Sequence, residues 1–327
     1  MTKLASRSRT LVLVVSVMLA LIPALPSAWA VRPVIGVPVN LVGLSGFPEG
    51  IAVGPDGNLY VSLISFSSTS KIVVVSPKGD ILRDIPVPAG PGANQTNLLG
   101  EIFDREGNLY VCDIGDAFSG GSNGRVLKIS PNGSMTTVAS GLSVPNGLAL
   151  DHSGSLYVSD SFQGKIWKVS PAGGVSVFSD SDLLRAHGSI PGVPPAGANG
   201  IAFTRADKAL LVGNTSDGTL VKIPIKKDGT AGTPSIMSHD VLGADGLALD
   251  TRGNIYVTLV PFNRIALLNP SGSLIATIEG TGDNVFRNPA SLAFRGRTLY
   301  ITDLTVFGGG NPGVSVMTAR FPGAPLK

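Results

Sequence analysis

The chain has 327 residues, with 25 lysines and arginines against 22 acidic residues and a hydrophobic content of 43%. Three of the basic residues lie within the first thirty positions, so the rest of the chain has 22 basic and 22 acidic side chains and is formally neutral. A neutral chain lacks the basic footprint of a nucleic-acid-binding protein. We therefore expect no nucleic-acid partner.

The first predicted element is an export signal over residues 1–30. Basic residues precede the apolar run LVLVVSVMLALIPAL, and the Ala-Trp-Ala at residues 28–30 supplies the small residues of a cleavage site. A membrane anchor is the alternative, but the run is shorter than the roughly 20 residues that a span needs, and prolines interrupt it. We expect a cleaved signal, a secreted or periplasmic protein, and no membrane attachment after cleavage.

Beyond the leader, one short phrase recurs six times. Examples are EGIAVGPDGNLYV from Glu49 and DGLALDTRGNIYV from Asp245. Aligned on their LYV-type segments, the copies recur at intervals of 44 to 54 residues, a period typical of solenoids and propellers. Since the repeats leave little room for a second domain, we expect residues 31–327 to form a single domain.

Each copy predicts four strands. An apolar strand is followed by a tight turn such as GPDGN or DREGN and then by the LYV-type strand. Third strands such as KIVVVSP and fourth strands such as SMTTVAS come next. Six units of four antiparallel strands predict an all-β fold, a six-bladed β-propeller.

The two ends of the repeat region are complementary. The last copy is followed by only one further strand pattern, GVSVMTA, and the segment VIGVPVNLVG before the first copy is an unassigned strand. Pairing of this N-terminal strand with the last blade would close the ring and remove an exposed edge. Cys112 is the only cysteine, so no internal disulfide can form, and its place in LYVCD predicts a buried, inert thiol.

The residues that open the six copies are the candidate site. The first strand of each blade lines the channel of a propeller, so these residues form a ring at one end. Four of them supply oxygen donors with a formal charge of −2, a set suited to Ca²⁺ or a similar divalent ion. The donors are Glu49, Asn146, Asn199 and Asp245, and the other two residues are Leu99 and Ala290.

A turn is the alternative explanation for these residues, because Asn-Gly and Asp-Gly are common turn dipeptides. However, Leu99 and Ala290 occupy the same place without a polar side chain, so folding does not require one there. Glu49 before glycine has no ordinary turn explanation. The aligned set therefore favours a metal site.

A second polar ring follows the LYV-type strands, which return to the same end of the channel. It contains Asp113, Asp160, Asn214 and Asp303. These side chains could hold the ligands in place, bind a second ion or contact substrate. Capping of turns through backbone hydrogen bonds is equally compatible with the sequence.

The histidines do not suggest a catalytic triad, because no nucleophile elbow accompanies them. His152 lies in a turn and is expected to be solvated. His187 and His239 lie in the connections that lead to the copies of Asn199 and Asp245. A role for either at the channel mouth stays open.

The repeated phrases resemble the senescence marker protein/gluconolactonase/luciferin-regenerating enzyme family and, more distantly, the paraoxonase and diisopropylfluorophosphatase propellers. The similarity covers Phe47–Asp303 and rests on PEG, PNGLALD, ANGIAF, ADGLALD and NPASLAF. Members of the family hold one catalytic divalent ion through a Glu, two Asn and an Asp in that chain order. Glu49, Asn146, Asn199 and Asp245 fall at those positions.

The resemblance implies a metal-dependent hydrolase of lactones or related esters, acting as a monomer on a small-molecule substrate, with Asp245 as candidate base or nucleophile. A divalent ion polarises a carbonyl, and a neighbouring carboxylate accepts the proton of attacking water. One departure is Asn146-Gly147, where lactonases of the family often have Asn-Asp. The alternatives are a non-catalytic NHL-type propeller that binds a protein or glycan, and a metal-free strictosidine-synthase-like enzyme or lyase.

Overall fold

The computed structural model describes residues 38–308 and 310–325, all within one compact unit. This part of the chain is all-β, apart from four single-turn 3₁₀ helices: η1 (Ala117–Ser119), η2 (Asp182–Leu184), η3 (Arg205–Asp207) and η4 (Val260–Phe262). None of the helices in these residues has the length and apolar character needed to cross a membrane. The predicted export signal lies outside the described residues.

The strands form groups of four in chain order. The first two groups are β2 (Phe47–Val53), β3 (Leu59–Ser67), β4 (Thr69–Val75), β5 (Ile81–Pro88), and β6 (Thr96–Phe103), β7 (Leu109–Asp113), β8 (Gly124–Ile129), β9 (Met135–Leu142). The next two are β10 (Pro145–Leu150), β11 (Leu156–Asp160), β12 (Lys165–Val169), β13 (Val175–Ser179), and β14 (Ala198–Phe203), β15 (Ala209–Asn214), β16 (Thr219–Pro224), β17 (Ser235–Ser238). The last two are β18 (Ala244–Leu249), β19 (Ile255–Leu259), β20 (Arg264–Leu268), β21 (Leu274–Ile278), and β22 (Pro289–Arg295), β23 (Thr298–Asp303), β24 (Gly313–Thr318), with β1 (Val39–Gly43).

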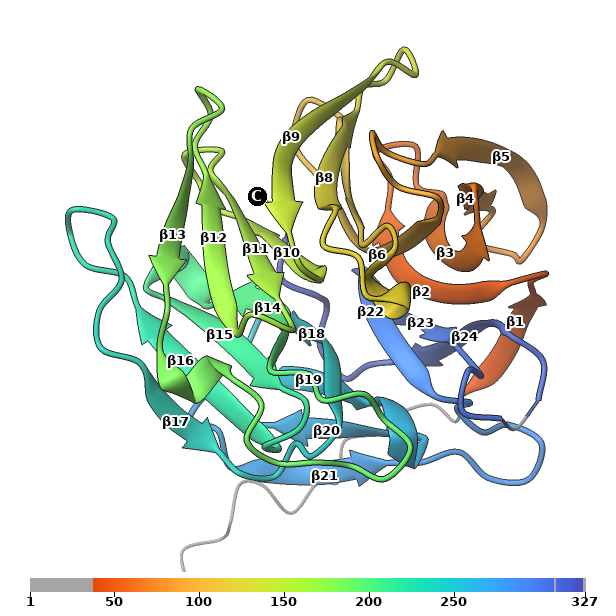
Figure 1. Ribbon diagram of the computed structural model, residues 1–327. Coiled ribbons are helices and arrows are strands. Elements are labelled where there is room, and N and C mark those ends of the chain that lie inside the picture. Colours follow the sequence, from red (N-terminus) through yellow and green to blue (C-terminus); the bar gives the residue numbers. More distant parts are fainter. Residues whose placement is uncertain (1–37, 309, 326–327) are drawn as a thin grey trace, which may run out of the picture. The chain divides into compact units, whose positions relative to one another are not determined.

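The groups are arranged like the blades of a propeller. Figure 1 shows the first strand of each group, β2, β6, β10, β14, β18 and β22, toward the middle of the molecule, with the later strands outside it. All of the pairings within the groups are antiparallel. The all-β, propeller-like prediction is therefore confirmed.

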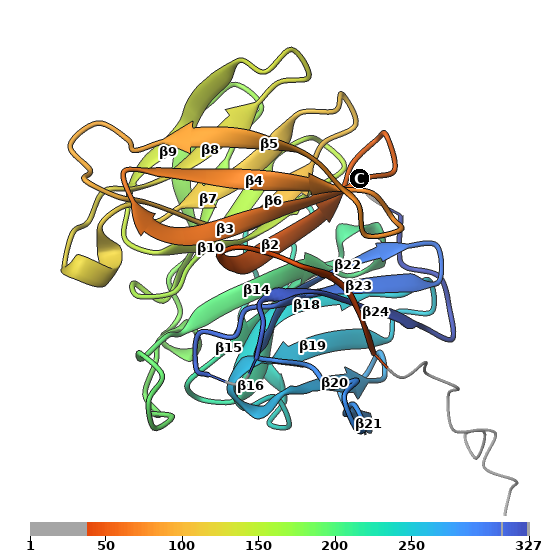
Figure 2. The ribbon, with the colours of Figure 1, turned by 90° about the vertical axis from the view of Figure 1, so that its right-hand side faces the viewer.

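The predicted number of separate sheets is wrong. The described residues form four separate four-stranded sheets, and the first two groups share one eight-stranded sheet. The cause is β3, whose nine residues run past the usual end of a second strand. Its extension pairs with the start of β6 through Ile64↔Asn97 and Ser67↔Thr96. Figure 2 shows β5, β4 and β3 side by side, with β6 next to β3.

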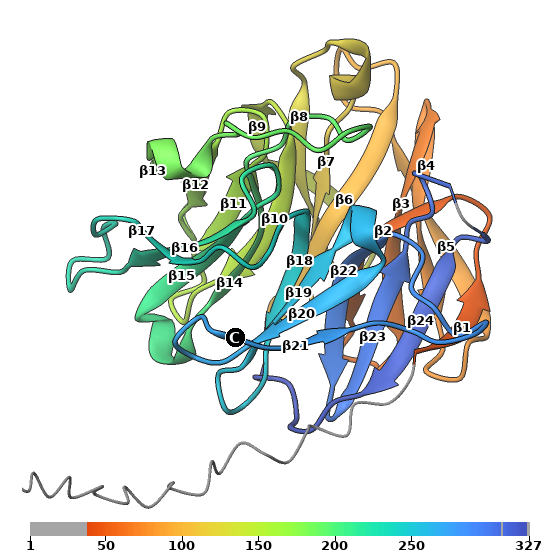
Figure 3. The same ribbon diagram turned by 90° about the horizontal axis from the view of Figure 1, so that it is seen from below.

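The N-terminal strand completes the last sheet, as the sequence predicts. β1 pairs antiparallel with β24, matching Val39 with Val316 and Gly43 with Gly313. Figure 3 shows β22, β23, β24 and β1 in this order. One sheet thus contains strands from both ends of the described chain.

The repeated phrase folds because its acidic residue organises the turn between the first two strands. Asp104 accepts hydrogen bonds from the backbone N–H of Asn108 at 2.8 Å, the Asn108 amide at 2.7 Å and the Tyr110 hydroxyl at 3.2 Å. Asp250 accepts two backbone N–H groups and the Asn254 amide in the same way. Side-chain acceptors of this kind stabilise tight turns. The D-x-x-G-N pattern therefore determines the turns that connect the first two strands at one end of the channel.

The hydrophobic core lies between successive groups of strands. One cluster joins Tyr60 and Val74 of the first group to Phe103 and Val111 of the second. Another joins the first group to Tyr300 and Val314 of the last sheet. Cys112 belongs to the cluster between the second and third groups, is fully buried, and has its pKa raised well above the usual value by burial. The prediction of a buried thiol is confirmed.

Candidate functional site

The six residues that open the repeats lie near the start of the inner strands, not in turns. Asn146 is the second residue of β10, Asn199 of β14 and Asp245 of β18. The pairing with the second strand shifts register just after each of them. Such an irregularity bends a strand and redirects its side chains. The turn interpretation of Asn-Gly and Asp-Gly is therefore wrong.

Glycine follows five of the six opening residues and is required there by close packing of neighbouring inner strands. A Cβ on Gly200 would lie 2.0 Å from the backbone oxygen of Asp245, and one on Gly50 would lie 2.3 Å from that of Leu99. Real Cβ atoms do not approach so closely. The same holds for Gly100, Gly147 and Gly246. Glycine thus allows the opening residues to crowd around the channel.

Hydroxyl groups on the second strands hold the crowded backbone in place. The Ser159 hydroxyl accepts the Gly147 N–H at 2.8 Å and donates to the backbone oxygen of Asn199. Thr302 accepts from Ser291 at 2.8 Å and donates to the backbone oxygen of Glu49 at 2.7 Å, which links the last sheet to the first strand group. Ser62 and Thr258 make equivalent bonds to Leu99 and Ala290. These residues satisfy backbone groups that the register shift leaves unpaired.

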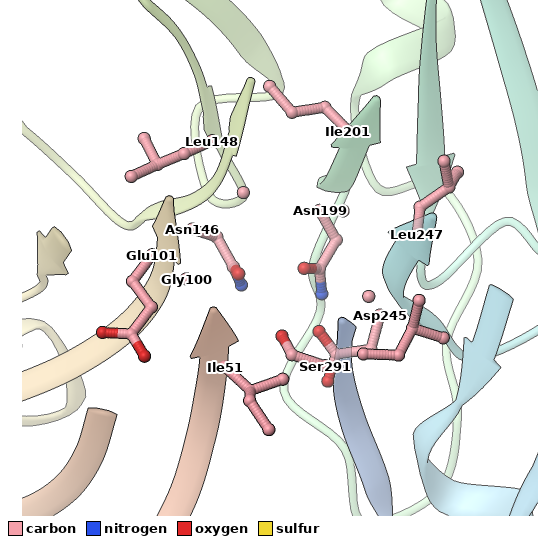
Figure 4. Close-up of a pocket in the computed structure, with 14 residues that line it drawn as sticks. Ile51, Gly100, Glu101, Asn146, Leu148, Asn199, Ile201, Asp245, Leu247 and Ser291 are labelled. Carbon is pink, nitrogen blue, oxygen red and sulfur yellow. The ribbon is translucent and has the colours of Figure 1, made fainter. Parts of the chain in front are cut away.

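Three of the four predicted donors meet at a small cavity at this end of the channel. It has a volume of about 70 Å³ and is lined by Asn146, Asn199 and Asp245, together with Glu101. Figure 4 shows the side chains of Asn146, Asn199 and Asp245 pointing toward a common space. Glu49 does not line this cavity, but it is close enough to Asp245 and Glu101 to interact with both electrostatically.

Several buried oxygens at the site have no hydrogen-bond partner. They include Oε2 of Glu49, which is 3% exposed, and Oδ1 of Asn199, which is 6% exposed. The Asn199 amide is oriented by Thr215, whose hydroxyl accepts the Asn199 Nδ2 at 3.0 Å and donates to the backbone oxygen of Ala244 at 2.6 Å. Unpaired buried acceptors are costly in a folded protein. A bound cation would satisfy them.

The acidic groups of the site disfavour one another's ionisation. Burial raises the pKa of Glu49 well above its usual range, and the charges of Asp245 and Glu101 raise it further. Burial also raises the pKa of Asp245 to about 7, although its hydrogen bond with the Asn199 side chain opposes the rise. Adjacent buried carboxylates are stable as anions only when a positive charge compensates them. The donor set of two carboxylates and two amides therefore fits a divalent ion.

Histidine and cysteine take no part in this set. Within the described ranges, no group of three or more His, Cys, Asp or Glu side chains is arranged to hold a metal ion. A site built half from asparagine amides falls outside that pattern. Hard, oxygen-rich donor sets of this kind are typical of Ca²⁺.

Comparison with known proteins bears on the same residues. The profile of the SMP-30/gluconolactonase/LRE-like region matches residues 100–183 and 193–305, more than half of the chain. The chain belongs to this family. Asn146, Asn199 and Asp245 lie within the matched residues, whereas Glu49 precedes them.

Individual relatives of this family member are distant. The lactonase drp35 of Staphylococcus aureus strain USA300 is 28% identical over 185 residues, which are 53% of this chain and 54% of that protein. The chain thus spans about half the length of the curated relatives it matches.

Solved structures match over more of the chain. A luciferin-regenerating enzyme has a TM-score of 0.63 at 15% identity, covering 90% of this chain and 100% of the other. A gluconolactonase of Xanthomonas campestris has a TM-score of 0.64 at 16% identity, covering 86% and 89%. At these identities the likeness concerns the fold.

Glu101 is a site residue that the sequence analysis did not identify. It lies two residues after Leu99, where the other copies have Ile51, Leu148, Ile201, Leu247 and Leu292. Burial raises the pKa of its carboxyl group to about 8, although the nearby backbone N–H groups of Ser62 and Ala52 oppose the rise. The aligned copies could have identified Glu101, because it is the one acid at a position that is apolar in the other five copies.

The second polar ring organises the connections around the site. Asp160 accepts the backbone N–H groups of Ser143 and Val144 at 2.8 and 3.0 Å. Asp113 accepts the Asn97 N–H at 3.1 Å and the Arg125 guanidinium at 2.9 Å. Asn214 donates to the backbone oxygen of Arg185, and Asp303 accepts the Arg287 N–H at 2.8 Å. These bonds are of the capping type, and none of the four residues lines the 70 Å³ cavity.

The histidines lie on the surface. The ring of His187 lies between Asp217, at 2.9 Å from Nδ1, and Asp182, at 3.3 Å from Nε2, and these hydrogen bonds raise its pKa. His152 pairs with Asp207. His239 is exposed. None of them lines the cavity that contains Asn146, Asn199 and Asp245.

Proposed function

We propose that the protein is a metal-dependent hydrolase of lactones or related esters. The observation that carries the proposal is the pair of buried, unpartnered oxygens on Glu49 and Asn199, at positions where the family resemblance expects metal ligands. Membership of the gluconolactonase-like family supports the substrate class. The ion would be held by Glu49, Asn146, Asn199 and Asp245, and Ca²⁺ suits these donors best.

When bound, such an ion polarises a substrate carbonyl and stabilises the negative charge that develops on its oxygen. Asp245 is the proposed base. Its carboxylate accepts a proton as a water oxygen attacks the carbonyl carbon, and it returns that proton to the alkoxide when the ester carbon–oxygen bond breaks. Thr215 acts indirectly, because it keeps the Asn199 carbonyl oxygen free of protein donors.

We also propose that the eight-stranded sheet functions as two blades, so that the chain is a closed six-bladed propeller. The apolar cluster and the Thr302–Glu49 hydrogen bond between the last sheet and the first strand group support this reading. An experimental structure in which β3 and β6 paired along their whole length would contradict it. We further propose that the protein is exported and that its signal is cleaved. Mass spectrometry of the secreted protein should then find a mature chain that begins at Val31.

Elemental analysis of the purified protein tests the metal proposal. We expect about one tightly held divalent ion per chain, and a melting temperature that falls on addition of EDTA, because a ligand that binds only the folded state stabilises it. In Glu49→Gln both the metal content and the response to EDTA should decrease. A chain without metal whose melting temperature ignored EDTA would instead favour the non-catalytic, partner-binding alternative.

A further inference from the structure

Exposed phenylalanines gather at one end of the molecule. Among the described residues, the most exposed phenylalanines are Phe66, Phe118, Phe162, Phe262 and Phe307. Phe66 lies at the end of the second strand of its group, and the other four lie between the second and third strands of theirs. These regions are at the end of the channel that bears the candidate site, since the opening residues of the inner strands meet the ends of the second strands. Exposed apolar groups concentrated in this way indicate binding.

Three aromatic rings form a continuous track from the site to this surface. Phe47 lies two residues before Glu49 and is partly exposed. Its ring centroid is 6.2 Å from that of Phe66, and the Phe66 centroid is 5.7 Å from that of Phe118. Phe66 and Phe118 are 45% and 44% exposed. Phe47 packs against the cluster that contains Ala290, so the track begins at an opening residue and ends in solvent.

The backbone at Phe66, the middle residue of the track, has a strained conformation. Its φ of 52° lies in the left-handed region, which a bulky residue rarely adopts. Such strain persists where the surrounding structure enforces it, and it is common at functional sites. Phe66 lies in the extension of β3 that pairs with β6, which is the feature that distinguishes the first group of strands from the others.

One buried side chain bonds the backbone near the two outer rings of the track, Phe66 and Phe118. The Asn97 Oδ1 accepts the Phe66 N–H at 2.8 Å, and its Nδ2 donates to the backbone oxygen of Gly115 at 2.9 Å. Gly115 leads into η1, which carries Phe118. Because Asn97 is fully buried, the positions of Phe66 and Phe118 are fixed together.

We propose that Phe47, Phe66 and Phe118 bind the apolar chain of the substrate, and that the substrates are esters or lactones with a medium-length alkyl or aryl chain. The proposal rests on the hydrolase function proposed above. The carbonyl of such a substrate reaches the oxygen-lined cavity while its chain lies along the aromatic track. Burial of the chain against the rings supplies the binding free energy.

Chain-length selectivity tests the proposal. We expect the ratio of kcat/KM for para-nitrophenyl octanoate over para-nitrophenyl acetate to fall about tenfold in Phe66→Ser and in Phe118→Ser, because each variant removes apolar contact with the longer chain. Phe162→Ser is the matched control, since Phe162 is 46% exposed at the same end but is not part of the track. Its ratio should equal that of the wild type. Circular dichroism verifies that all three variants fold.

Binding without chemistry separates this proposal from the hydrolase function. We expect calorimetry to detect binding of octanoate to the wild type and to Phe162→Ser, with about tenfold weaker binding to Phe66→Ser. Octanoate binding without hydrolysis of any ester would refute the function and leave the track intact. Hydrolysis with an unchanged ratio in Phe66→Ser and Phe118→Ser would overturn the track. The protein can also be sedimented with phosphatidylcholine vesicles. If the wild type sedimented with them and all three substitutions reduced this binding equally, the track would be overturned in favour of docking to a bilayer.

Discussion

The two ends of the central channel are built by the same inner strands, but they differ in whether their polar side chains are hydrogen-bonded. At one end, aspartates such as Asp104 and Asp250 accept several hydrogen bonds from the turn that follows. At the other end, Glu49 and Asn199 have buried oxygens without any partner. The features that the repeats share stabilise the fold at the first end. The exceptions among the repeats collect at the second end, where they remain available to a ligand.

The residues between the two ends of the channel mark a change from a polar to an apolar lining. Glu101 lines both the 70 Å³ cavity and a second cavity of about 210 Å³ toward the turns, which is lined mainly by apolar residues of the inner strands and by Ala324 and Pro325. The position of Glu101 is apolar in every other copy. The ring of residues shared by the two cavities is therefore apolar except for this one acid.

The largest effect is expected when the charge at one end of β18 is removed and the charge at the other end is kept. Asp245 lies near the start of β18 and Asp250 directly after its end. We expect Asp245→Asn to lower kcat at least about 100-fold, because it removes the proposed base, while the far-ultraviolet circular dichroism stays native. Assays with para-nitrophenyl esters measure the loss. Normal activity in Asp245→Asn would refute the mechanism.

The crowding of the inner strands predicts a large loss of stability. Gly200→Ala places a Cβ 2.0 Å from the Asp245 backbone oxygen, so we expect the free energy of unfolding to fall by about 2–4 kcal/mol. Urea denaturation measures the change. Gly173→Ala is the control: nothing lies within 4 Å of its Cβ, and its φ of +83° costs only about 1 kcal/mol. Equal losses in both variants would show that close approach is unimportant.

The pH dependence of stability tests the acid between the two cavities. The folded-state pKa of Glu101 is raised from 4.5 to about 8, so its protonated form favours the folded state. That contribution is complete below pH 4.5 and is lost as the pH rises to about 8. In EDTA, we expect the wild type to lose stability over this range and Glu101→Leu to lose up to about 1 kcal/mol less per pH unit. Parallel pH profiles would contradict this assignment.

The smallest effect is expected at the turn end. Asp250→Asn retains an acceptor for the N–H groups of Arg252 and Asn254 but weakens the bond from the Asn254 amide. We expect a loss of about 1 kcal/mol in the free energy of unfolding and unchanged kcat. Urea denaturation and the ester assay check both values. If Asp250→Asn lowered ester hydrolysis as much as we expect for Asp245→Asn, the two ends could not be separated in function.

The sequence predicts most of the fold because the repeats contain local signals. Alternating apolar residues and D-x-x-G-N turns specify the strands, and the spare strand before Glu49 is matched by the incomplete last copy. The union of the first two groups could not be predicted, since it depends on Asn97 and Phe66, which lie outside the repeated phrase. Long-range hydrogen bonds of single side chains leave no periodic trace.

Only part of the candidate site can be predicted from the sequence. The internal alignment selects Glu49, Asn146, Asn199 and Asp245, because Leu99 and Ala290 show that folding tolerates apolar residues there. The same alignment contains Glu101, whose significance depends on its burial. The role of Asp160 could not be decided, because a cap and a ligand holder require the same residue. Its bonds to Ser143 and Val144 became visible only in the structure.

The pairing of β1 with β24 has a consequence for the order in which the chain can fold. The first five groups of strands all lie between β1 and β24 in the chain, so the sheet of β1 and β24 cannot form until β24 itself has left the ribosome. Contacts between such distant segments slow folding, and an unpaired edge strand is prone to aggregation in the meantime. The earlier sheets, by contrast, are assembled from neighbouring segments. Of the described strands, β1 therefore waits longest for its partner and is most in need of protection.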